Sequence, residues 1–310
     1  MKWKVRHICC KVFLVASLVP CSCSLEDERD LCCNQVVMEY SYQPYREEAF
    51  SEYIQSLRHY LFDMGGNYIG EIPADITLTR QRLSLEAGDY TMVTVGNASA
   101  NTLCECDPAE GLSDFSLSVH EKFEKSEEVL CNTDQLYWGV KEFTVAKSGQ
   151  QRFVTMMNNI HCHLEVQVVW NNMPEYIGDY EMELSGVPGG YVLCPDSCSQ
   201  VNGFVIPKTD EGICSHRLRV PLKSQKLYGE FITLRYTDVS IPFFRLWYQN
   251  KPITGRINLK KAFREWGWFP SRVHVQQYRI QLKVFGNGTV EVSPWIDTTI
   301  EDWVNGGTFG

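Results

Sequence analysis

The stretch YRIQLKVFGNGTVEV, residues 278–292, decides the fold class of this 310-residue chain. Apolar and polar residues alternate over 278–284, and the alternation resumes over 290–292. A period of two residues places the apolar side chains on one face of a β-strand. The intervening Gly286-Asn287-Gly288 accepts the positive backbone angles of a hairpin turn. The stretch therefore predicts two antiparallel strands that each turn one face to a core.

The same alternation recurs through most of the chain and predicts further strands. These predicted strands cover residues 36–42, 59–62, 68–70, 90–95, 153–154, 160–170, 180–184, 218–222, 231–236 and 243–248. Asp63-Met64-Gly65-Gly66-Asn67 is a predicted hairpin turn between two of them. Helical spacing is confined to two short segments, residues 46–57 and 257–266.

Many short strands without alternating βαβ units predict an all-β protein with minor helix. The expected architecture is two tandem antiparallel β-sandwiches with Greek-key connections. Asn171-Asn172-Met173-Pro174 has the composition of a linker. We therefore expect an N-terminal sandwich over 35–170 and a C-terminal sandwich over 171–310. No internal sequence repeat relates the two halves.

The N-terminus has the pattern of a bacterial lipoprotein signal peptide. Its first eleven residues carry four basic side chains and no acid, and an apolar run of about 8 residues follows at Val12–Val19. That run is far shorter than the roughly 20 residues of a membrane-spanning helix. Cys23 directly follows the small Ser22, so we expect removal of residues 1–22 and acylation of Cys23 by chains such as palmitate. Acylation of Cys21, or secretion without lipid, are the alternatives.

Residues 23–34 form a predicted acidic tether behind the lipid. Residues 24–30 contain four acids and one base, a composition that does not fold by itself. The run also resembles the acidic export tags of surface-exposed lipoproteins, which favours the outer face of an outer membrane. Loss of residues 1–22 removes four bases and no acid, so the net charge changes from −9 to −13. This acidic balance argues against nucleic-acid binding.

The cysteine and histidine clusters do not predict a metal site or a cofactor. On a strand, the two histidines of His161-Cys162-His163 share one face and the cysteine points to the other, so the triplet cannot place three ligands on one ion. Nine cysteines follow Cys23, and because nine is odd at least one has no partner within the chain if the others are oxidised. Their connectivity stays open. The local clusters are Cys104-Glu105-Cys106 and Cys194-Pro195-Asp196-Ser197-Cys198.

No catalytic motif stands out. The sequence has no Gly-x-Ser-x-Gly elbow, no HExxH helix and no phosphate-binding glycine loop, and it singles out no pair of carboxylates. Trp266 and Trp268 admit two interpretations, packing in a core or a flat platform for a sugar ring. The residues alone favour an attachment or binding protein over an enzyme.

Several stretches, in their order, resemble the fimbrillin-A-associated anchor lipoproteins, the FimB-type family of type V pili. Residues 61–68, LFDMGGNY, are similar to the YVFDxxGxY hairpin of that family. Residues 85–97, LEAGDYTMVTVGN, resemble its LPxGxYxxVxWGN segment, although Glu86-Ala87 and Thr94-Val95 depart from the pattern. Leu136–Gly139 and the following 143–145 are similar to its LFxG step. The resemblance is densest over residues 20–170.

The resemblance implies tandem transthyretin-like sandwiches in a lipoprotein of the outer membrane. Such proteins hold a fimbrial shaft at the cell surface and, in some systems, limit its length or take part in assembly. The implied partner is a fimbrillin-like shaft subunit that joins by strand addition. The strand 35–43, which follows the tether, is a candidate for regulating the groove that receives it. The residues of the binding edge stay unknown at this stage.

Two rival functions remain. One is a surface glycan-binding lipoprotein that works with an outer-membrane transporter, and an exposed, flat Trp266–Trp268 platform would favour it. The other is a surface hydrolase, which would need two facing carboxylates in a cleft.

Overall fold

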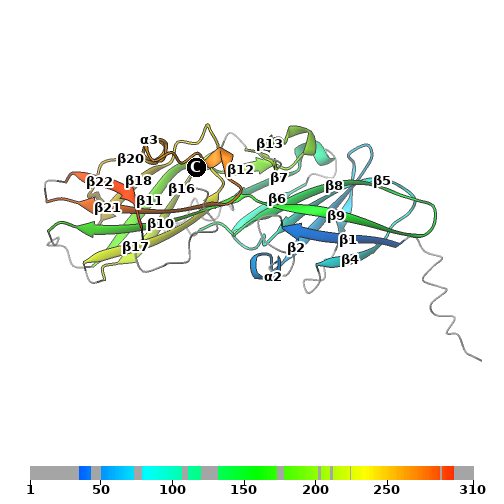
Figure 1. Ribbon diagram of the computed structural model, residues 1–310, viewed down its shortest axis with the longest axis horizontal. Helices are drawn as coiled ribbons and strands as arrows, with labels where there is room; N and C mark the ends of the chain where they lie inside the picture. The colour runs from blue at the N-terminus through cyan, green and yellow to red at the C-terminus, as the bar shows by residue number, and fades with distance from the viewer. Residues whose placement is uncertain are drawn as a thin grey trace, which may run out of the picture.

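A computed structural model of the chain describes residues 35–42, 50–72, 79–106, 111–119, 132–172, 178–201, 204–209, 212–223, 225–286 and 288–296. Cys23 and the rest of the predicted signal and tether lie outside these residues. Strands dominate and form two lobes that follow one another along the long axis of the molecule (Figure 1). The all-β prediction is therefore confirmed. Within the described ranges, no helix has the length and apolar character needed to cross a membrane.

The first lobe is a sandwich made from one sheet that folds over on itself. Its strands are β1 (Gln35–Tyr42), β2 (Leu57–Asp63), β3 (Tyr68–Ile72), β4 (Arg80–Ser84), β5 (Gly88–Gly96), β8 (Tyr137–Val145) and β9 (Gln150–Asn159). Their hydrogen-bonded order is β3-β2-β5-β8-β9-β1-β4. Because β8 and β9 pair at only two positions, Tyr137–Asn159 and Trp138–Asn158, the layers β3-β2-β5-β8 and β9-β1-β4 separate and enclose a core.

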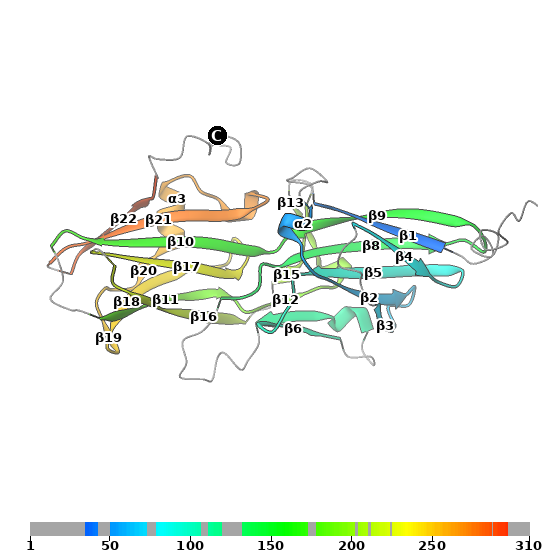
Figure 2. The same cartoon turned by 90° about the horizontal axis from the view of Figure 1, so that it is seen from below.

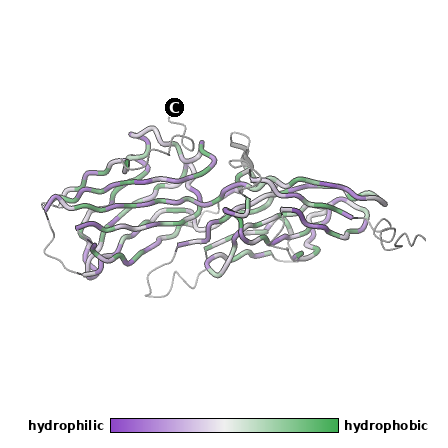
Figure 3. Tube along the Cα trace, turned by 60° about the horizontal axis from the view of Figure 1, so that its bottom comes forward, coloured by the Kyte–Doolittle hydropathy of each residue, from purple (hydrophilic) through white to green (hydrophobic). Residues whose placement is uncertain are grey.

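The second lobe packs two sheets around the largest core. Its strands are β10 (His161–Trp170), β11 (Asp179–Pro188), β16 (Ile213–Pro221), β17 (Lys226–Leu234), β18 (Phe243–Tyr248), β19 (Lys251–Pro252), β20 (Ile257–Asn258), β21 (Gln276–Val284) and β22 (Val290–Pro294). One layer is β17-β10-β21-β22 and the other is β16-β11-β18, with β19 and β20 on β18. The predicted hairpin over 278–292 is thus confirmed as β21 and β22. Alternating hydrophilic and hydrophobic segments follow the strands (Figure 3).

The chain returns once from the second lobe to the first. After β11 it forms β12 (Gly190–Val192), β13 (Ser199–Val201), β14 (Phe204–Ile206) and β15 (Lys208–Thr209) before β16. Strand β12 pairs with β7 (Ser116–Val119), which also pairs with β6 (Thr102–Glu105), and β13 and β14 form a separate ribbon. The resulting sheet covers the outer face of β2, β5 and β8, so these strands are buried on both sides. This second core joins the lobes.

The predicted boundary between the halves needs correction. The strand predicted over 160–170 exists as β10, but it pairs with β17 and β21 and therefore belongs to the second lobe. The chain passes from β9 to β10 through Ile160, and the two strands lie in different lobes (Figure 2). The alternation of residues 164–168 predicts a strand correctly, but it carries no information on the sheet that the strand joins.

The two predicted helices have different outcomes. The segment 257–266 forms α3 (Leu259–Glu265), whose N-terminus is capped by the Asn258 side chain. In the segment predicted over 46–57, the described helix is the single turn α2 (Phe50–Tyr53), and Leu57 begins β2. Short 3₁₀ turns occur at Gly111–Asp114, Pro195–Ser197 and Pro270–Arg272.

Both lobes share one topology although their sequences show no repeat. In each lobe the first strand lies between an antiparallel neighbour and a parallel one: β1 between β4 and β9, and β10 between β17 and β21. The parallel pairs were not expected from the sequence. The lobes differ in what lies beyond the parallel neighbour. In the second lobe, β22 pairs with the far edge of β21. No described strand takes the corresponding place beside β9 over residues 150–157.

The quoted motifs of the first lobe have structural roles. In the β2–β3 hairpin, Gly66 adopts a φ of 78°, and the Asp63 carboxylate accepts from the Asn67 backbone N–H at 2.9 Å and from its side-chain amide. At the end of β5, Asn97 adopts a φ of 61°. Its side-chain oxygen accepts from the backbone N–H groups of residues 55 and 56, and its amide donates to the backbone oxygens of residues 53 and 135. Asn97 therefore fastens three chain segments together.

Replacing Asn97 should destabilise the first lobe. Asn97→Ala removes four hydrogen bonds and leaves a β-carbon in the left-handed region, and we expect a loss of about 2–4 kcal/mol in the free energy of unfolding. Asn97→Gly is the matched control, because it loses the same bonds without that backbone penalty and should recover about 1 kcal/mol. Denaturant unfolding measures both, and native stability of the alanine variant would contradict the assignment.

Candidate strand-docking edge

The far edge of β9 is the feature of the first lobe that best fits a strand partner. Over Gln150–Met157, β9 pairs with β1 through a parallel ladder. On its other side it pairs with β8 only at Asn158 and Asn159. Because alternate backbone groups of a strand point to opposite edges, part of the N–H and C=O groups of residues 150–157 point to a side without a ladder among the described strands. We call this side the β9 edge.

The β9 edge exposes two large apolar side chains and carries little charge. Val154 and Met156 are 44% and 37% exposed although both are large and hydrophobic. Arg152 is the single charged residue of β9, and its guanidinium forms an ion pair with Glu39 on β1. Soluble proteins usually protect an exposed edge with charges, prolines or a covering segment. The β14 strand lies close to β9, but no ladder joins them in the described pairings.

The C-terminal end of the β9 edge is set by a close approach between β8 and β9 at residues 155 and 156. A β-carbon built at Gly139 would lie 2.6 Å from the Met156 carbonyl oxygen and 2.9 Å from a Thr155 methyl group. Only a glycine permits that spacing, which explains the glycine of the LFxG-like motif. Further along, β8 and β9 diverge into the two layers, and Phe143 and Phe153 fill the space with ring centroids 5.1 Å apart.

Strand β1 is firmly built into the layer next to the β9 edge. Its alternate residues Val36, Met38, Tyr40 and Tyr42 are at most 4% exposed. On the solvent face, Glu39 forms ion pairs with Arg80 of β4 and Arg152 of β9. The bond from Arg152 is the main cause that lowers the pKa of Glu39. Both arginine side chains are more than half exposed, so each pair contributes below about 1 kcal/mol and burial provides most of the attachment.

A buried histidine links β1 to the opposite layer. His59 of β2 is fully buried and its Nε2 lies 3.2 Å from the Tyr40 hydroxyl, while its Nδ1 lies 3.1 Å from the Thr94 hydroxyl of β5. The rings of Tyr40 and His59 are stacked, with centroids 5.2 Å apart. Burial lowers the pKa of His59 to about 4. The imidazole is therefore neutral at pH 7 and acts as a structural hydrogen-bonding group.

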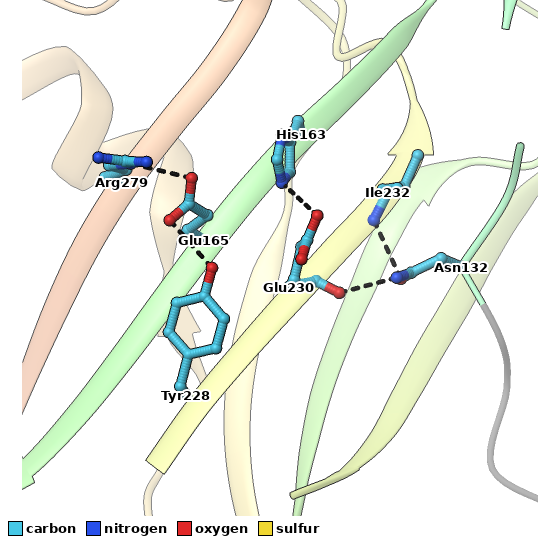
Figure 4. Close-up of polar contacts among 7 residues, drawn as sticks. All are labelled: Asn132, His163, Glu165, Tyr228, Glu230, Ile232 and Arg279. Carbon is cyan, nitrogen blue, oxygen red and sulfur yellow. Dashed lines mark hydrogen bonds and ion pairs between the residues drawn. The ribbon is translucent and has the colours of Figure 1, made fainter. Parts of the chain in front are cut away.

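The His161-Cys162-His163 triplet lies at the start of β10 and has structural contacts. His161 is buried between the lobes, with Nδ1 2.9 Å from the Leu136 carbonyl oxygen, and Cys162 lies in the core of the second lobe. His163 forms an ion pair with Glu230 at 2.8 Å (Figure 4). The described residues include no group of three or more histidine, cysteine or acidic side chains arranged for a metal ion.

Figure 4 shows the polar ladder around His163. Glu165 receives a hydrogen bond from Arg279 at 2.9 Å and another from the Tyr228 hydroxyl at 3.0 Å. Beside it, the Asn132 side chain donates to the Glu230 carbonyl oxygen and accepts from the Ile232 N–H. These contacts hold β10, β17 and β21 in register and attach the segment before β8 to the second lobe.

The cysteine clusters do not form disulfides in the described part of the chain. The six cysteines there are thiols, at residues 104, 106, 162, 194, 198 and 214. Burial raises the pKa of Cys104 and, to about 12, that of Cys198. Thiols with raised pKa values are poor nucleophiles at neutral pH. Cys21, Cys23, Cys32, Cys33 and Cys131 lie outside the described residues.

Trp266 and Trp268 pack on the core of the second lobe and do not form a flat platform. Their ring planes are inclined by 72°, with centroids 5.0 Å apart. Trp268 stacks on Tyr278 at 5.3 Å and contacts Phe263 at 5.4 Å. Both indoles are half-buried against this core. The packing interpretation of the pair is confirmed. These two indoles do not form the flat platform that would have favoured a glycan-binding function.

Comparison with known proteins agrees with this architecture. A family model described as "Fimbrillin-A associated anchor proteins Mfa1 and Mfa2" matches residues 29–210, which is more than half of the chain. The chain belongs to this anchor family. The matched region covers the first lobe and continues through the β12–β15 return. Membership confirms the family resemblance and implies a place at the cell surface or in the envelope.

Solved structures show the same fold at low sequence identity. The fimbrial anchor protein Mfa2 from Porphyromonas gingivalis has 15% identity and a TM-score of 0.57, with 85% of this chain and 98% of that chain covered. A candidate adhesin from Bacteroides thetaiotaomicron has 18% identity, a TM-score of 0.59 and coverages of 85% and 97%. A candidate polysaccharide-binding protein from the same species has 15% identity, a TM-score of 0.60 and coverages of 86% and 99%. No curated protein sequence matches the chain.

The burial of His59 predicts a pH-dependent stability. The unfolded chain binds a proton at His59 below about pH 6.5, whereas the folded chain does so only near pH 4. The free energy of unfolding should therefore decrease as the pH falls from 6.5 to 4. His59→Gln, which does not titrate, should reduce this slope, and the buried His161, with a pKa also lowered to about 4, should account for part of the remainder. Denaturant unfolding at several pH values measures the slope, and an unchanged slope in His59→Gln would contradict the argument.

Proposed function

We propose that this anchor-family chain attaches a fimbria to the outer membrane through lipid on Cys23. Family membership supports the fimbrial role. The basic start, the short apolar run and the cysteine after Ser22 support the lipid attachment. The acidic tether then separates the first lobe from the bilayer surface. Participation in fimbrial assembly or length control is part of the same proposal, because the protein that receives the first subunit can also limit further addition.

The shaft subunit docks, in this proposal, by adding an extended strand to the β9 edge. The observation that carries it is the difference between the lobes: β22 covers the far edge of β21, and no described strand covers the equivalent residues of β9. An added strand would form main-chain hydrogen bonds with residues 150–157. Val154 and Met156 would provide apolar contacts for alternate side chains of that strand.

Lipid attachment makes a direct prediction. Cys23→Ala should release the chain from the membrane fraction and remove surface-attached fibres, whereas Cys21→Ala, the matched control, should leave both unchanged because residue 21 is removed with the signal. Mass spectrometry of proteins that copurify with the native chain should recover a fimbrillin-like shaft subunit. Recovery of a transporter and glycan-processing proteins, with fibres unaffected by Cys23→Ala, would contradict the proposal.

The docking edge can be tested by placing charge on it. The double substitution Val154→Lys and Met156→Lys should weaken capture of the shaft subunit by at least tenfold, because an added strand would bury two ammonium groups. Ile213→Lys on β16 is the matched control, since Ile213 is also hydrophobic and 76% exposed. Unchanged capture by the β9 variant, with a normal unfolding transition, would remove the β9 edge from the proposal.

Strand β1 is the candidate regulator of the docking groove. It lies between β4 and β9 and directly follows the tether, so its removal would open a slot lined by the core that now covers Val36 and Met38. Deletion of residues 34–43 should therefore change shaft-subunit binding, measured by copurification and compared with the native chain after both are checked for folded β structure. Binding that is unaffected by the deletion would exclude this role.

A further inference from the structure

The outer face of the second lobe contains a polar hollow that is far from the β9 edge. It lies on β16, β11 and β18, has a volume of about 330 Å³, and is lined by Glu183, Ser185, Ser215, Phe243, Arg245 and Arg256. That volume is at the lower end of the roughly 300–1,000 Å³ of small-molecule sites. The cross-strand row Ser215–Ser185–Phe243 explains its shape. Two small serines stand beside a large ring, and Arg245 and Arg256 form the adjoining walls.

The two arginines of the hollow have no acidic partner among the described residues. Ion pairs on this face join Arg217 to Glu181 and Glu183, but none between described residues involves Arg245 or Arg256. The Arg245 Nε atom is buried and has no hydrogen-bond partner among the described residues. A buried, unpaired guanidinium N–H is costly unless a ligand supplies an acceptor. The geometry therefore suits an anionic group, and a planar carboxylate matches the two-pronged donor face of arginine.

Aromatic contacts hold both arginines in place. The Arg245 guanidinium lies 5.2 Å from the centre of the Trp247 ring, and Arg217 lies 5.0 Å from the same ring. Arg256 lies 4.2 Å from the centre of the Phe243 ring. Stacking on a ring restricts a long side chain and leaves the in-plane N–H groups able to donate. The hollow is consequently a prearranged donor site.

Glu183 selects the class of anion. Its Oε2 accepts a hydrogen bond from the Trp247 indole N–H at 2.5 Å and lies 3.7 Å from Arg217. These two contacts hold the Glu183 carboxylate in the wall of the hollow. Its Oε1 forms no hydrogen bond or ion pair with the described residues and can accept from a ligand. A simple acid would be repelled by this carboxylate. A ligand that combines a carboxylate with hydroxyl donors would satisfy the arginines and Glu183 together.

We infer that this hollow binds a carboxylate-bearing sugar, such as a uronic acid unit of a glycan. The carboxylate lies between Arg245 and Arg256, the sugar hydroxyls donate to Glu183 and exchange hydrogen bonds with Ser185 and Ser215, and the ring edge packs on Phe243. The site is independent of fimbrial docking, because it uses the second lobe and none of the residues of the β9 edge.

Calorimetric titration of the full chain with D-glucuronate tests the inference. Glucuronate should bind at least tenfold more tightly than D-glucose, which lacks the carboxylate, and than L-glutamate, which lacks the hydroxyls. Arg256→Gln, at an exposed position that the fold does not need, should weaken glucuronate binding at least tenfold. Arg219→Gln is the matched control, because Arg219 lies on the same sheet face outside the hollow.

Each outcome decides the inference. Selective binding of glucuronate that is lost in Arg256→Gln and kept in Arg219→Gln supports it. No binding of glucuronate, equal binding of glucose, or equal binding of L-glutamate would overturn it, the last because an acidic peptide would then be the better ligand. Loss of binding in both variants would also overturn it, since the effect would come from general charge. None of these results bears on capture of the shaft subunit, so the two proposals fail separately.

Discussion

The position of β1 between β4 and β9 is the constraint on which the first lobe depends. Eight residue pairs join β1 to β9 and five join it to β4, so neither neighbour has a complete layer without it. Its buried face supplies Val36, Met38, Tyr40 and Tyr42 to the core, and Tyr40 reaches the opposite layer through His59. Strand β1, which directly follows the predicted tether, thus holds together the layer β9-β1-β4.

The repeated topology explains how one fold carries two different surfaces. Both lobes place their first strand beside a parallel partner, but only the second lobe adds β22 to the far edge of that partner. Among the described strands, the corresponding side of β9 has no ladder over residues 150–157, while one face of the second lobe carries a polar hollow. The β12–β15 return and the one-residue passage at Ile160 connect the lobes.

Sequence periodicity predicted most strands of this fold but not their neighbours. The hairpin over 278–292 was predicted because its alternation and its glycine turn agree. Strand β10 was assigned to the wrong lobe because alternation at 164–168 is the same in either sheet. The β9 edge was not predicted from the sequence. Residues 153–157 carry apolar side chains on both faces of the strand, so their periodicity does not indicate which face is exposed. Leu57 follows helical spacing, yet pairing with β5 places it in a strand.

Pairing of an added strand with β9 can be measured by hydrogen–deuterium exchange. Amide exchange should be measured on the anchor chain alone and in complex with the fimbrial shaft subunit. In the complex we expect slower exchange within residues 150–157, with β3 and β22 unchanged, because new ladder hydrogen bonds protect amides only on the strand that gains a partner. Unchanged exchange in 150–157, together with protection at another sheet edge, would contradict it.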